Sequence, residues 1–332
     1  MPIRILRSTD TNPWFNLATE DWIFRDLDPA VPVLFLWRNQ PNIVIGRHQN
    51  PWRECDLQKM EAQDVLLTRR QSGGGAVYQD LGNSCFTFLE GKATYSRERN
   101  FALLVRALAR FGIEAEVSGR NDITVDGRKV SGNAFKEAPD RAFHHGTMLL
   151  HVDLGRLGEL LRPDPRKLAA KGIASVRSRV ANLQDFCPDL DHERFCDALA
   201  DVFRDHHQDD APVEELDRPD LDHLPALAEH YTLQQDWDWR FGATPDFAHH
   251  LAGKFDWGLI DVHLDTRRGR ITTARVFSDS LHPDMIDRVM ERLPETPYRG
   301  ADVRERLLAA ADGQDYATEM EELAGWLGEQ IG

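Results

Sequence analysis

Residues 69–78 read Arg-Arg-Gln-Ser-Gly-Gly-Gly-Ala-Val-Tyr and lie between two stretches that have the pattern of β-strands. Three consecutive glycines lose much backbone freedom on folding, so they are typical of a turn with positive φ or of close approach to the backbone. The N–H groups of such a turn can bind an anion, and Arg69 and Arg70 stand at its entrance. The alternative is a flexible loop with solvated arginines. Neither the Walker nor the dinucleotide glycine pattern is present, so the stretch alone indicates only a ligand near the backbone.

The composition restricts the classes of partner. The 332 residues suffice for one large domain or two, and a hydrophobic content of 41% is ample for a core. A net charge of −15 argues against nonspecific nucleic-acid binding and against an anionic membrane surface, because both need basic surface. Any phosphate site is therefore expected to be a local basic pocket in an acidic protein.

Neither a signal peptide nor a membrane span is predicted. Residues 1–13 lack a long apolar core with a cleavage pattern, and no run of about 18 apolar residues occurs. The four cysteines lack the paired spacing of metal sites; they are Cys55, Cys85, Cys187 and Cys196. We therefore expect a cytoplasmic chain with reduced, unpaired cysteines.

Apolar periodicity predicts strands and helices that do not alternate strictly. Asn12 and Pro13 are typical of a helix start, and Gly112 is typical of a helix end. Strands are expected at 1–6, 33–37, 42–46, 65–69, 85–88, 115–118 and 143–152, and helices at 13–27, 54–63, 101–111, 153–161 and 191–203. This order favours an α+β fold, in which helices flank a mixed β-sheet, over a doubly wound fold.

A second informative stretch surrounds the dipeptide Asp126-Gly127, which is a strong hairpin signal between two β-rich runs. Strand alternation then predicts that Lys129, Ser131 and Asn133 share one face of the strand. From these residues alone a solvated surface lysine is the more common interpretation of Lys129, and contact with an anion is the alternative.

A third stretch, 167–182, carries four basic residues and few core-like runs in an otherwise acidic protein. We interpret it as a mobile basic loop over a phosphate, and a solvated connection between helices is the alternative. It includes Lys171 and Arg177.

The C-terminal part is predicted to form a second, smaller α+β domain. The acidic stretch 209–222 is expected to be a surface excursion, and 237–242 a strand or edge segment that closes the first domain. A hairpin of 257–264 and 271–277 is followed by helices from about residue 283 onward. The expected limits are a catalytic domain at 1–243, a linker at 244–250 and an accessory domain at 251–332.

Taken together, these stretches resemble the lipoate–protein ligase A family over nearly the full length. The segments that carry the resemblance are 12–18, 33–38, 44–47, 69–80, 118–122, 128–132, 143–147 and 167–182. Each would be weak alone, but together they are highly specific. The family implies a catalytic domain shared with biotin ligases and octanoyl transferases, and a small C-terminal domain.

The resemblance implies an ATP-dependent ligase. Members of the family convert lipoate and ATP to lipoyl-AMP, release pyrophosphate and pass the lipoyl group to a lysine of a carrier domain. The implied carriers are the lipoyl domains of 2-oxoacid dehydrogenase complexes and the glycine-cleavage H protein. The implied metal is Mg²⁺, and we expect a cytoplasmic monomer that binds neither nucleic acid nor membrane.

The resemblance, together with the chemistry of the residues, assigns roles by position. Lys129 is expected to be catalytic and to contact both ATP and lipoate. The other ATP-binding candidates are Arg70, Gly75, Ala76, Val77, Tyr78, Asn121, Lys171 and Arg177. The other lipoate-binding candidates are Trp37, Val44, Ser72, Gly73, Gly74 and His145. Asp122 is the candidate Mg²⁺ ligand, because Mg²⁺ takes few carboxylates beside phosphate and water. Arg69 is expected to be structural, and the apolar candidates could equally be core residues.

Two positions depart from the family pattern. Gln79 stands where histidine is frequent, and Asn133 stands where serine is frequent. Both residues keep hydrogen-bonding ability, so we expect activity to be retained.

Three other functions are possible alternatives for such a chain. An octanoyl transferase uses a cysteine nucleophile without ATP, but 167–182 contains no cysteine. A biotin ligase fits the N- and C-terminal segments less well. A non-catalytic carrier-binding scaffold would show no ATP-dependent turnover.

Overall fold

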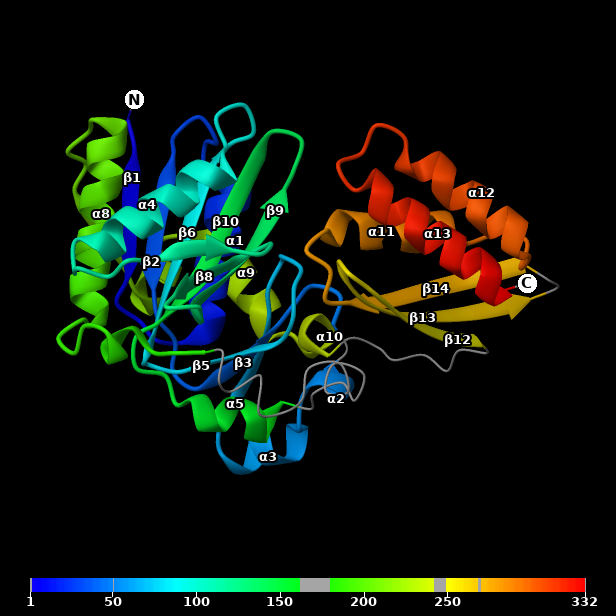
Figure 1. Cartoon of the computed structure of the whole chain (residues 1–332), viewed down its shortest axis with the longest axis horizontal. Coiled ribbons are helices and arrows are strands. Elements are labelled where there is room, and N and C mark those ends of the chain that lie inside the picture. Colours follow the sequence, from blue (N-terminus) through cyan, green and yellow to red (C-terminus); the bar gives the residue numbers. More distant parts are fainter. Residues whose placement is uncertain (1, 50, 162–179, 242–248, 268–269, 332) are drawn as a thin grey trace. The chain divides into compact units, whose positions relative to one another are not determined.

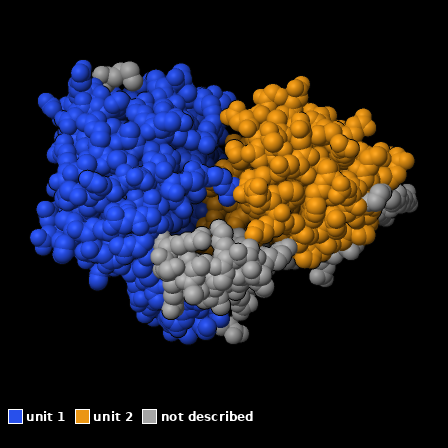
Figure 2. Space-filling view, viewed as in Figure 1, with its two compact units in different colours: residues 1–45, 51–70, 77–240 blue, residues 46–50, 71–76, 241–332 orange. Residues whose placement is uncertain are grey.

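The computed structural model describes residues 2–49, 51–161, 180–241, 249–267 and 270–331. By their contacts these residues group into two units (Figure 2), one of 1–45, 51–70 and 77–240, and one of 46–50, 71–76 and 241–332. The glycine-rich loop thus groups with the C-terminal residues, although the sequence-based limits place it in the catalytic domain. Those limits stay a prediction. None of the helices that the structure describes is long and apolar enough to cross a membrane.

The first unit is built on an eight-stranded mixed sheet (Figure 1). Its order is β11 (Val213–Leu216), β1 (Arg4–Ser8), β2 (Val33–Trp37), β6 (Asn83–Gly91), β10 (Arg141–Leu149), β9 (Arg128–Glu137), β8 (Asp122–Val125) and β7 (Glu116–Ser118). Strand β1 runs parallel to both of its neighbours, and the other pairs are antiparallel. The acidic stretch is therefore more than a surface excursion, because it supplies the edge strand β11.

A smaller sheet and a set of helices complete this unit. In the sheet, β3 (Asn42–Ile45) pairs parallel with β4 (Leu66–Arg69) and antiparallel with β5 (Val77–Gln79). The helical segments are α1 (Pro13–Asp26), α2 (Pro51–Glu54), α3 (Leu57–Ala62), α4 (Arg97–Ala109), α5 (Leu154–Leu160), η1 (Leu183–Asp185), α8 (His192–His207), η2 (Arg218–Asp222), α9 (Pro225–Gln235) and α10 (Trp237–Arg240). The strand expected at 237–242 was wrong, because α10 is helical.

Two apolar cores enclose the large sheet. Helices α4 and α8 cover one face through a cluster that includes Phe86, Phe88 and Phe203. Helices α1 and α9 cover the other face through a cluster that includes Phe35 and Phe143. The sheet is thus buried on both sides, which explains why its central strands are continuous apolar runs.

Helix α1 begins as predicted. The Asn12 side chain accepts hydrogen bonds from the N–H groups of Trp14 and Phe15, and Pro13 occupies the first helical position. The helix places two acidic side chains, Glu20 and Asp21, in the interior, each about 1% exposed.

The buried acid Asp21 provides a test of stability against pH. Its carboxylate accepts a hydrogen bond from Gln234 Nε2 at 2.9 Å, but burial raises its pKa from 3.8 to about 6, with a further contribution from Glu20. Because the folded-state pKa is the higher one, stability falls as pH rises from about 4 to about 6 and stays lower above it.

We therefore expect Asp21→Asn to raise the free energy of unfolding at pH 7.5 by about 2 kcal/mol. This allows about 3 kcal/mol for the pKa shift, less about 1 for the new amide donor. Urea unfolding at pH 4 and pH 7.5 measures the effect; at the lower pH the gain should be absent and the new amide donor should leave a loss of about 1 kcal/mol. The control is Asp26→Asn on the same helix, where a partly exposed carboxylate bonds His230 and the change should stay within about 1 kcal/mol. An equal gain for Asp21→Asn at both pH values would contradict the proposed cause.

The second unit packs three helices on one face of a three-stranded antiparallel sheet (Figure 1). The strands are β12 (His249–Phe255), β13 (Gly258–Arg267) and β14 (Arg270–Ser278), and the helices are α11 (Pro283–Arg292), α12 (Gly300–Ala311) and α13 (Ala317–Ile331). The predicted hairpin corresponds to β13 and β14, but β12 was missed and begins inside the expected linker. The α+β class is confirmed for both units.

Candidate active site

The hairpin that presents Lys129 has the predicted two-residue turn. Asp126 and Gly127 have φ of 50° and 70°, and both values suit the type I′ turn that an Asp-Gly pair favours. Strands β8 and β9 pair on either side of this turn.

A β-bulge in this hairpin reverses part of the expected pattern. Lys129 pairs with Thr124 and Ser131 pairs with Ile123, so Val130 is an extra residue on β9. Lys129 therefore does not share a face with Ser131 and Asn133, and that prediction was wrong. The physical cause is the extra residue, which shifts the alternation by one position.

Lys129 is accessible and paired with a carboxylate. Its Nζ lies 2.7 Å from Asp122 Oδ1, and each side chain is 36% exposed. A Cβ on Gly132 would lie 3.1 Å from that Nζ, so the lysine runs across a position without a side chain. The carbonyl oxygen of Lys129 accepts a hydrogen bond from Ala181 N–H at 2.9 Å. The end of the basic segment 167–182 therefore lies against the strand that carries Lys129.

Asn121 and Asn133 bind each other's backbone. Asn121 Nδ2 donates to the Asn133 carbonyl at 2.6 Å, and Asn133 Nδ2 donates to the Asn121 carbonyl at 3.1 Å. Asn133 Oδ1 also contacts His144 Nε2 at 2.8 Å within the core. Asn133 thus stabilises β9 from the face opposite to that of Lys129. These contacts explain how the strand accommodates an asparagine at this position.

The other departure, Gln79, also has a structural partner. Gln79 is 4% exposed, and its Oε1 accepts a hydrogen bond from Asn39 Nδ2 at 2.9 Å. Asn39 Oδ1 in turn accepts from Asn16 Nδ2. Gln79 therefore belongs to a buried row of amides that joins α1 to β5.

The two arginines before the glycines differ in their contacts. Arg69 donates to the carbonyls of Trp239 and Arg240 at 2.9 and 2.8 Å, so its guanidinium binds the end of α10. Arg70 is buried, and its Nη1 donates to the Val44 carbonyl at 3.0 Å. Burial lowers the pKa of Arg70 to about 10, while the charge of Glu20 acts in the opposite direction. Arg70 is thus a desolvated cation at the end of β4.

The glycine loop makes close backbone contact within the C-terminal unit. Gly74 has φ of 92°, and its N–H donates to the Ser280 carbonyl at 2.9 Å. A Cβ on Gly73 would lie 1.9 Å from the same oxygen, whereas a Cβ on Gly75 would meet no described atom within 4 Å. Ser72 is fully buried, and its carbonyl accepts from Arg47 N–H at 2.9 Å. Gly73 is therefore required by packing and Gly74 by its positive φ, whereas a Cβ on Gly75 has room among the described residues.

Sequence reasoning missed Glu20. Its Oε1 lies 2.8 Å from His145 Nδ1 and accepts a hydrogen bond from Thr87 Oγ1 at 2.6 Å. Trp37 Nε1 in turn lies 3.5 Å from Thr87 Oγ1. Glu20 therefore joins two predicted lipoate-binding residues, Trp37 and His145. Its position within the apolar stripe of α1, between Trp14 and Trp22, was the only signal in the sequence.

Several candidates are core residues in this structure. Trp37, Val44 and Tyr78 are 3%, 2% and 4% exposed, and Val77 is partly buried opposite Val44. Their roles at a ligand stay predictions. Lys171 and Arg177, and with them most of the expected mobile loop, lie outside the described residues.

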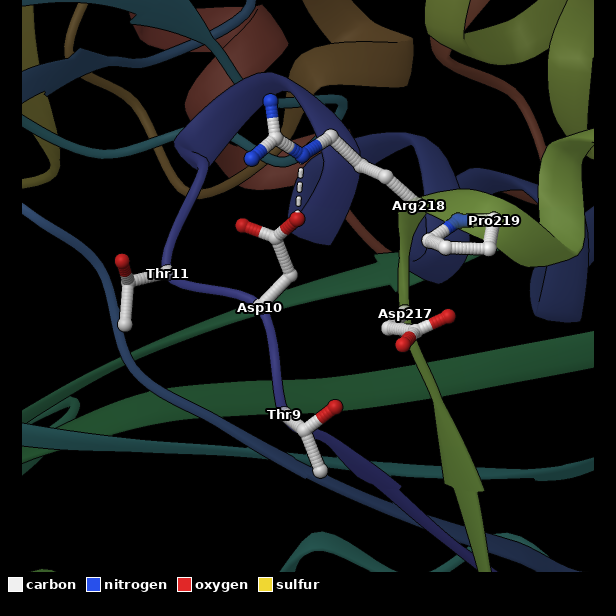
Figure 3. Close-up of a pocket in the computed structure, with 6 residues that line it drawn as sticks. All are labelled: Thr9, Asp10, Thr11, Asp217, Arg218 and Pro219. Carbon is white, nitrogen blue, oxygen red and sulfur yellow. Dashed lines mark hydrogen bonds and ion pairs between the residues drawn. The ribbon is translucent and has the colours of Figure 1, made fainter.

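An open hollow of about 490 Å³ occurs elsewhere on the first unit (Figure 3). It is lined by Thr9, Asp10, Thr11, Asp217, Arg218 and Pro219. Arg218 reaches across to pair with Asp10, which satisfies both charges. None of the candidate site residues lines this hollow, so we assign it no catalytic role.

Comparisons with known proteins agree with the resemblance. Residues 12–204 match the family model of the lipoyl protein ligase A/B catalytic domain, and residues 244–327 match that of the bacterial lipoate protein ligase C-terminus. The chain belongs to the lipoyl protein ligase A/B family. The first match alone covers more than half of the chain.

Individual members of the family are similar over most of their length. The lipoate-protein ligase A of Psychrobacter cryohalolentis is 49% identical over 98% of both chains. The structure of Plasmodium falciparum LipL1 in complex with lipoate is 31% identical, covers 98% of this chain and 99% of its own, and has a TM-score of 0.86. A crystal structure of lipoate-protein ligase A bound with ATP is 25% identical over 73% of this chain and 99% of its own, with a TM-score of 0.62.

Membership in the ligase A/B family confirms the enzyme class inferred from the sequence. The chain is a lipoate–protein ligase, with the catalytic and C-terminal parts that such a ligase has. The roles of individual residues are a separate question.

Proposed function

We propose that this ligase forms lipoyl-AMP from lipoate and ATP on the sheet face that carries Lys129, and then transfers the lipoyl group to a lysine of a carrier domain. The observation that supports this most is the accessible Lys129 ammonium, which crosses the open position above Gly132. Adenylation joins two anions, so it needs a positive charge fixed near both. A lysine ammonium is a compact charge that can contact a carboxylate and a phosphate together.

Asp122 has a second role in this proposal. In the described structure its carboxylate neutralises Lys129, and an arriving anion would compete for that lysine. Asp122 would then be available to Mg²⁺, which accepts one or two carboxylates beside phosphate oxygens and water. The metal would neutralise charge on the phosphates of ATP. The amide nitrogen of Asn121 is engaged with backbone, so only its Oδ1 would serve as a ligand contact.

The remaining predicted contacts are assigned as follows. Arg70 binds a phosphate of ATP as the second cation, together with Gly75, Ala76, Val77 and Tyr78 of the run that follows, and with Lys171 and Arg177. Trp37, Val44 and His145 line the lipoate slot, and Ser72, Gly73 and Gly74 contact the ligand through the loop. Glu20 orients His145, because the two side chains share a buried hydrogen bond. This bond fixes the imidazole on the sheet face that carries Lys129.

A cysteine-dependent acyl transfer finds no support at Cys85 or Cys196. Burial raises the pKa of Cys85 well above its ordinary value, and that of Cys196 to about 12. The thiolate is the nucleophilic form, and both thiols are disfavoured as thiolates near neutral pH. We therefore retain the ATP-dependent reaction.

We propose as partners the lipoyl domains of 2-oxoacid dehydrogenase complexes and the glycine-cleavage H protein. The carrier lysine attacks the adenylate carbonyl as a neutral amine, and water must be excluded while it does so. We place the enzyme in the cytoplasm, where such carriers would meet it, and we propose that it acts as a monomer.

The decisive experiment is ATP–pyrophosphate exchange without a carrier. We expect exchange that depends on added lipoate and on Mg²⁺, followed by a mass increase of one lipoyl group when a lipoyl domain is added. A folded enzyme that shows no lipoate-dependent exchange but transfers octanoate from acyl carrier protein would overturn the proposal. A folded enzyme with neither activity would favour the scaffold.

Gly75 tests whether a ligand approaches the loop backbone. Because a Cβ there meets no atom of the described residues within 4 Å, Gly75→Ala should leave the thermal unfolding midpoint within about 1 °C of wild type. If ATP approaches this backbone as predicted, the added methyl should weaken ATP binding at least about 10-fold, or about 1.4 kcal/mol. Titration calorimetry measures the ATP affinity of wild type and of Gly75→Ala. Unchanged ATP affinity would place the nucleotide away from Gly75.

A further inference from the structure

One face of the C-terminal sheet carries two histidines and an aspartate side by side. In the antiparallel pair of β12 and β13, His250 lies directly opposite His263, and Asp261 precedes His263 by two residues. Opposite residues and residues two apart share a sheet face. Ile260 and Val262, which alternate with Asp261 and His263 along β13, belong to the apolar core that the sheet shares with the three helices. The three polar side chains therefore project from the face that the helices do not cover.

The side chains of these three residues converge. His263 Nε2 lies 3.1 Å from Asp261 Oδ1, and His250 Nε2 contacts the same oxygen. The two imidazole rings are stacked, with centroids 4.5 Å apart and planes 16° from parallel. The side-chain exposure rises from 9% for Asp261 through 19% for His263 to 52% for His250. The group thus has a buried carboxylate at its base and an exposed imidazole at its entrance.

We propose that His250, Asp261 and His263 form a binding site for a divalent transition metal, with Zn²⁺ the best match. Each residue offers one ligand atom, and these three atoms lie within 4.8 Å of one another. Two imidazoles and a carboxylate are a common donor set for Zn²⁺, with water in the fourth position. Mg²⁺ prefers an all-oxygen shell, so this site is chemically different from the one proposed for the Mg²⁺ of ATP.

The geometry requires only small movements of side chains. Zn–N and Zn–O bonds of about 2.0–2.1 Å place tetrahedral ligand atoms about 3.3 Å apart. His250 is half exposed and can rotate, whereas Asp261 and His263 are already fixed by their strand. At present both imidazoles contact the same oxygen of Asp261. A metal bound between the three side chains would take the place of these two contacts.

Nearby charges have opposing effects on a cation at this face. Asp265 follows His263 by two residues and adds negative charge, and Arg275 lies directly opposite His263 on β14. Both are exposed, so water screens them. The net charge of the three ligands and the metal would be +1. Asp265 and Arg275 carry opposite charges, so together they add nothing to it.

The site would join β12 to β13 through side chains. Strand β12 is an edge strand of this sheet, and among the described strands it pairs with β13 alone. A metal bound to both strands stabilises the folded unit by mass action, so its occupancy should raise the unfolding temperature. The site lies within the C-terminal unit and does not depend on the proposed reaction.

The test is titration of the chelator-treated full-length ligase with ZnCl₂ in a calorimeter, followed by Co²⁺ absorption. Wild type should bind one Zn²⁺ per chain at this site, raise its unfolding midpoint with Zn²⁺, and show tetrahedral Co²⁺ bands. We expect His250→Gln and Asp261→Asn each to weaken binding at least about 10-fold. Because His250 is half exposed, His250→Gln tests the site even if Asp261→Asn fails to fold.

The matched control is His249→Gln on the same strand. His249 Nε2 contacts Thr266 Oγ1 at 3.2 Å and its ring stacks on Tyr298, on the opposite face. This variant should bind Zn²⁺ as wild type does. No saturable binding by wild type, or equal binding by wild type and His250→Gln, would overturn the proposal. The three side chains would then form a hydrogen-bonded cluster that holds no metal.

Discussion

Lys129→Ala is expected to reduce lipoate-dependent ATP–pyrophosphate exchange by at least about 10³-fold, which corresponds to about 4 kcal/mol of transition-state stabilisation. The ammonium is the accessible cation on the sheet face that we assign to adenylation, and no other donor on β9 crosses the open position at Gly132 in the described structure. The fold should survive, because the Lys129 and Asp122 side chains are both more than one-third exposed and water can solvate the remaining carboxylate. The exchange assay and a thermal melt together test this.

Lys136→Ala is the matched control for this prediction. Lys136 lies on the same strand, and its ammonium stands 5.9 Å from the centre of the Phe24 ring. Its loss should change exchange by less than about 3-fold, because a cation–π contact is worth about 1 kcal/mol or less at such a site. Lys129→Arg should not restore the wild-type rate, because the planar guanidinium cannot replace a compact charge. Normal exchange by a folded Lys129→Ala enzyme would remove Lys129 from the first step.

The second large effect is expected at Gly73. Its missing Cβ would lie 1.9 Å from the Ser280 carbonyl oxygen and 2.9 Å from the carbonyl carbon, both of which are backbone atoms that cannot rotate away. Gly73→Ala should therefore displace the loop or the segment of Ser280. We expect a loss of about 3 kcal/mol in the free energy of unfolding. Urea unfolding measures this loss, and faster hydrogen exchange at Gly74 N–H would report the broken bond to Ser280.

Gly75→Ala provides the comparison within the same loop. Both substitutions add one methyl group to a glycine of the loop, but only the one at Gly73 meets an atom at once. If Gly73→Ala is as stable as Gly75→Ala, the close contact with Ser280 does not determine the position of the loop. If both lose about 3 kcal/mol, the loop tolerates an added methyl group at neither glycine, and the contact with Ser280 is not the specific cause.

Local signals in the sequence predicted much of the fold. Asn12 and Pro13 marked the start of α1, Asp126-Gly127 marked the turn of the hairpin, and apolar runs marked the central strands. These features depend on neighbouring residues along the chain, so they can be read without the tertiary structure. Strand β12 was missed because polar residues begin it, and α10 was mistaken for a strand because its two tryptophans alternate with charged residues and tryptophan favours strands.

The amino-acid sequence by itself determined the family and the α+β class, because these are properties of motifs and their order, and it made Lys129 the main candidate for the reaction. Only the tertiary structure decided which neighbours Lys129 has. The extra residue Val130 changes the register of β9, and a bulge is a property of the pairing between two strands rather than of either strand alone. The burial of Glu20 against His145 and the contact of Gly73 with Ser280 join residues more than a hundred positions apart, and such contacts arise only when the chain packs.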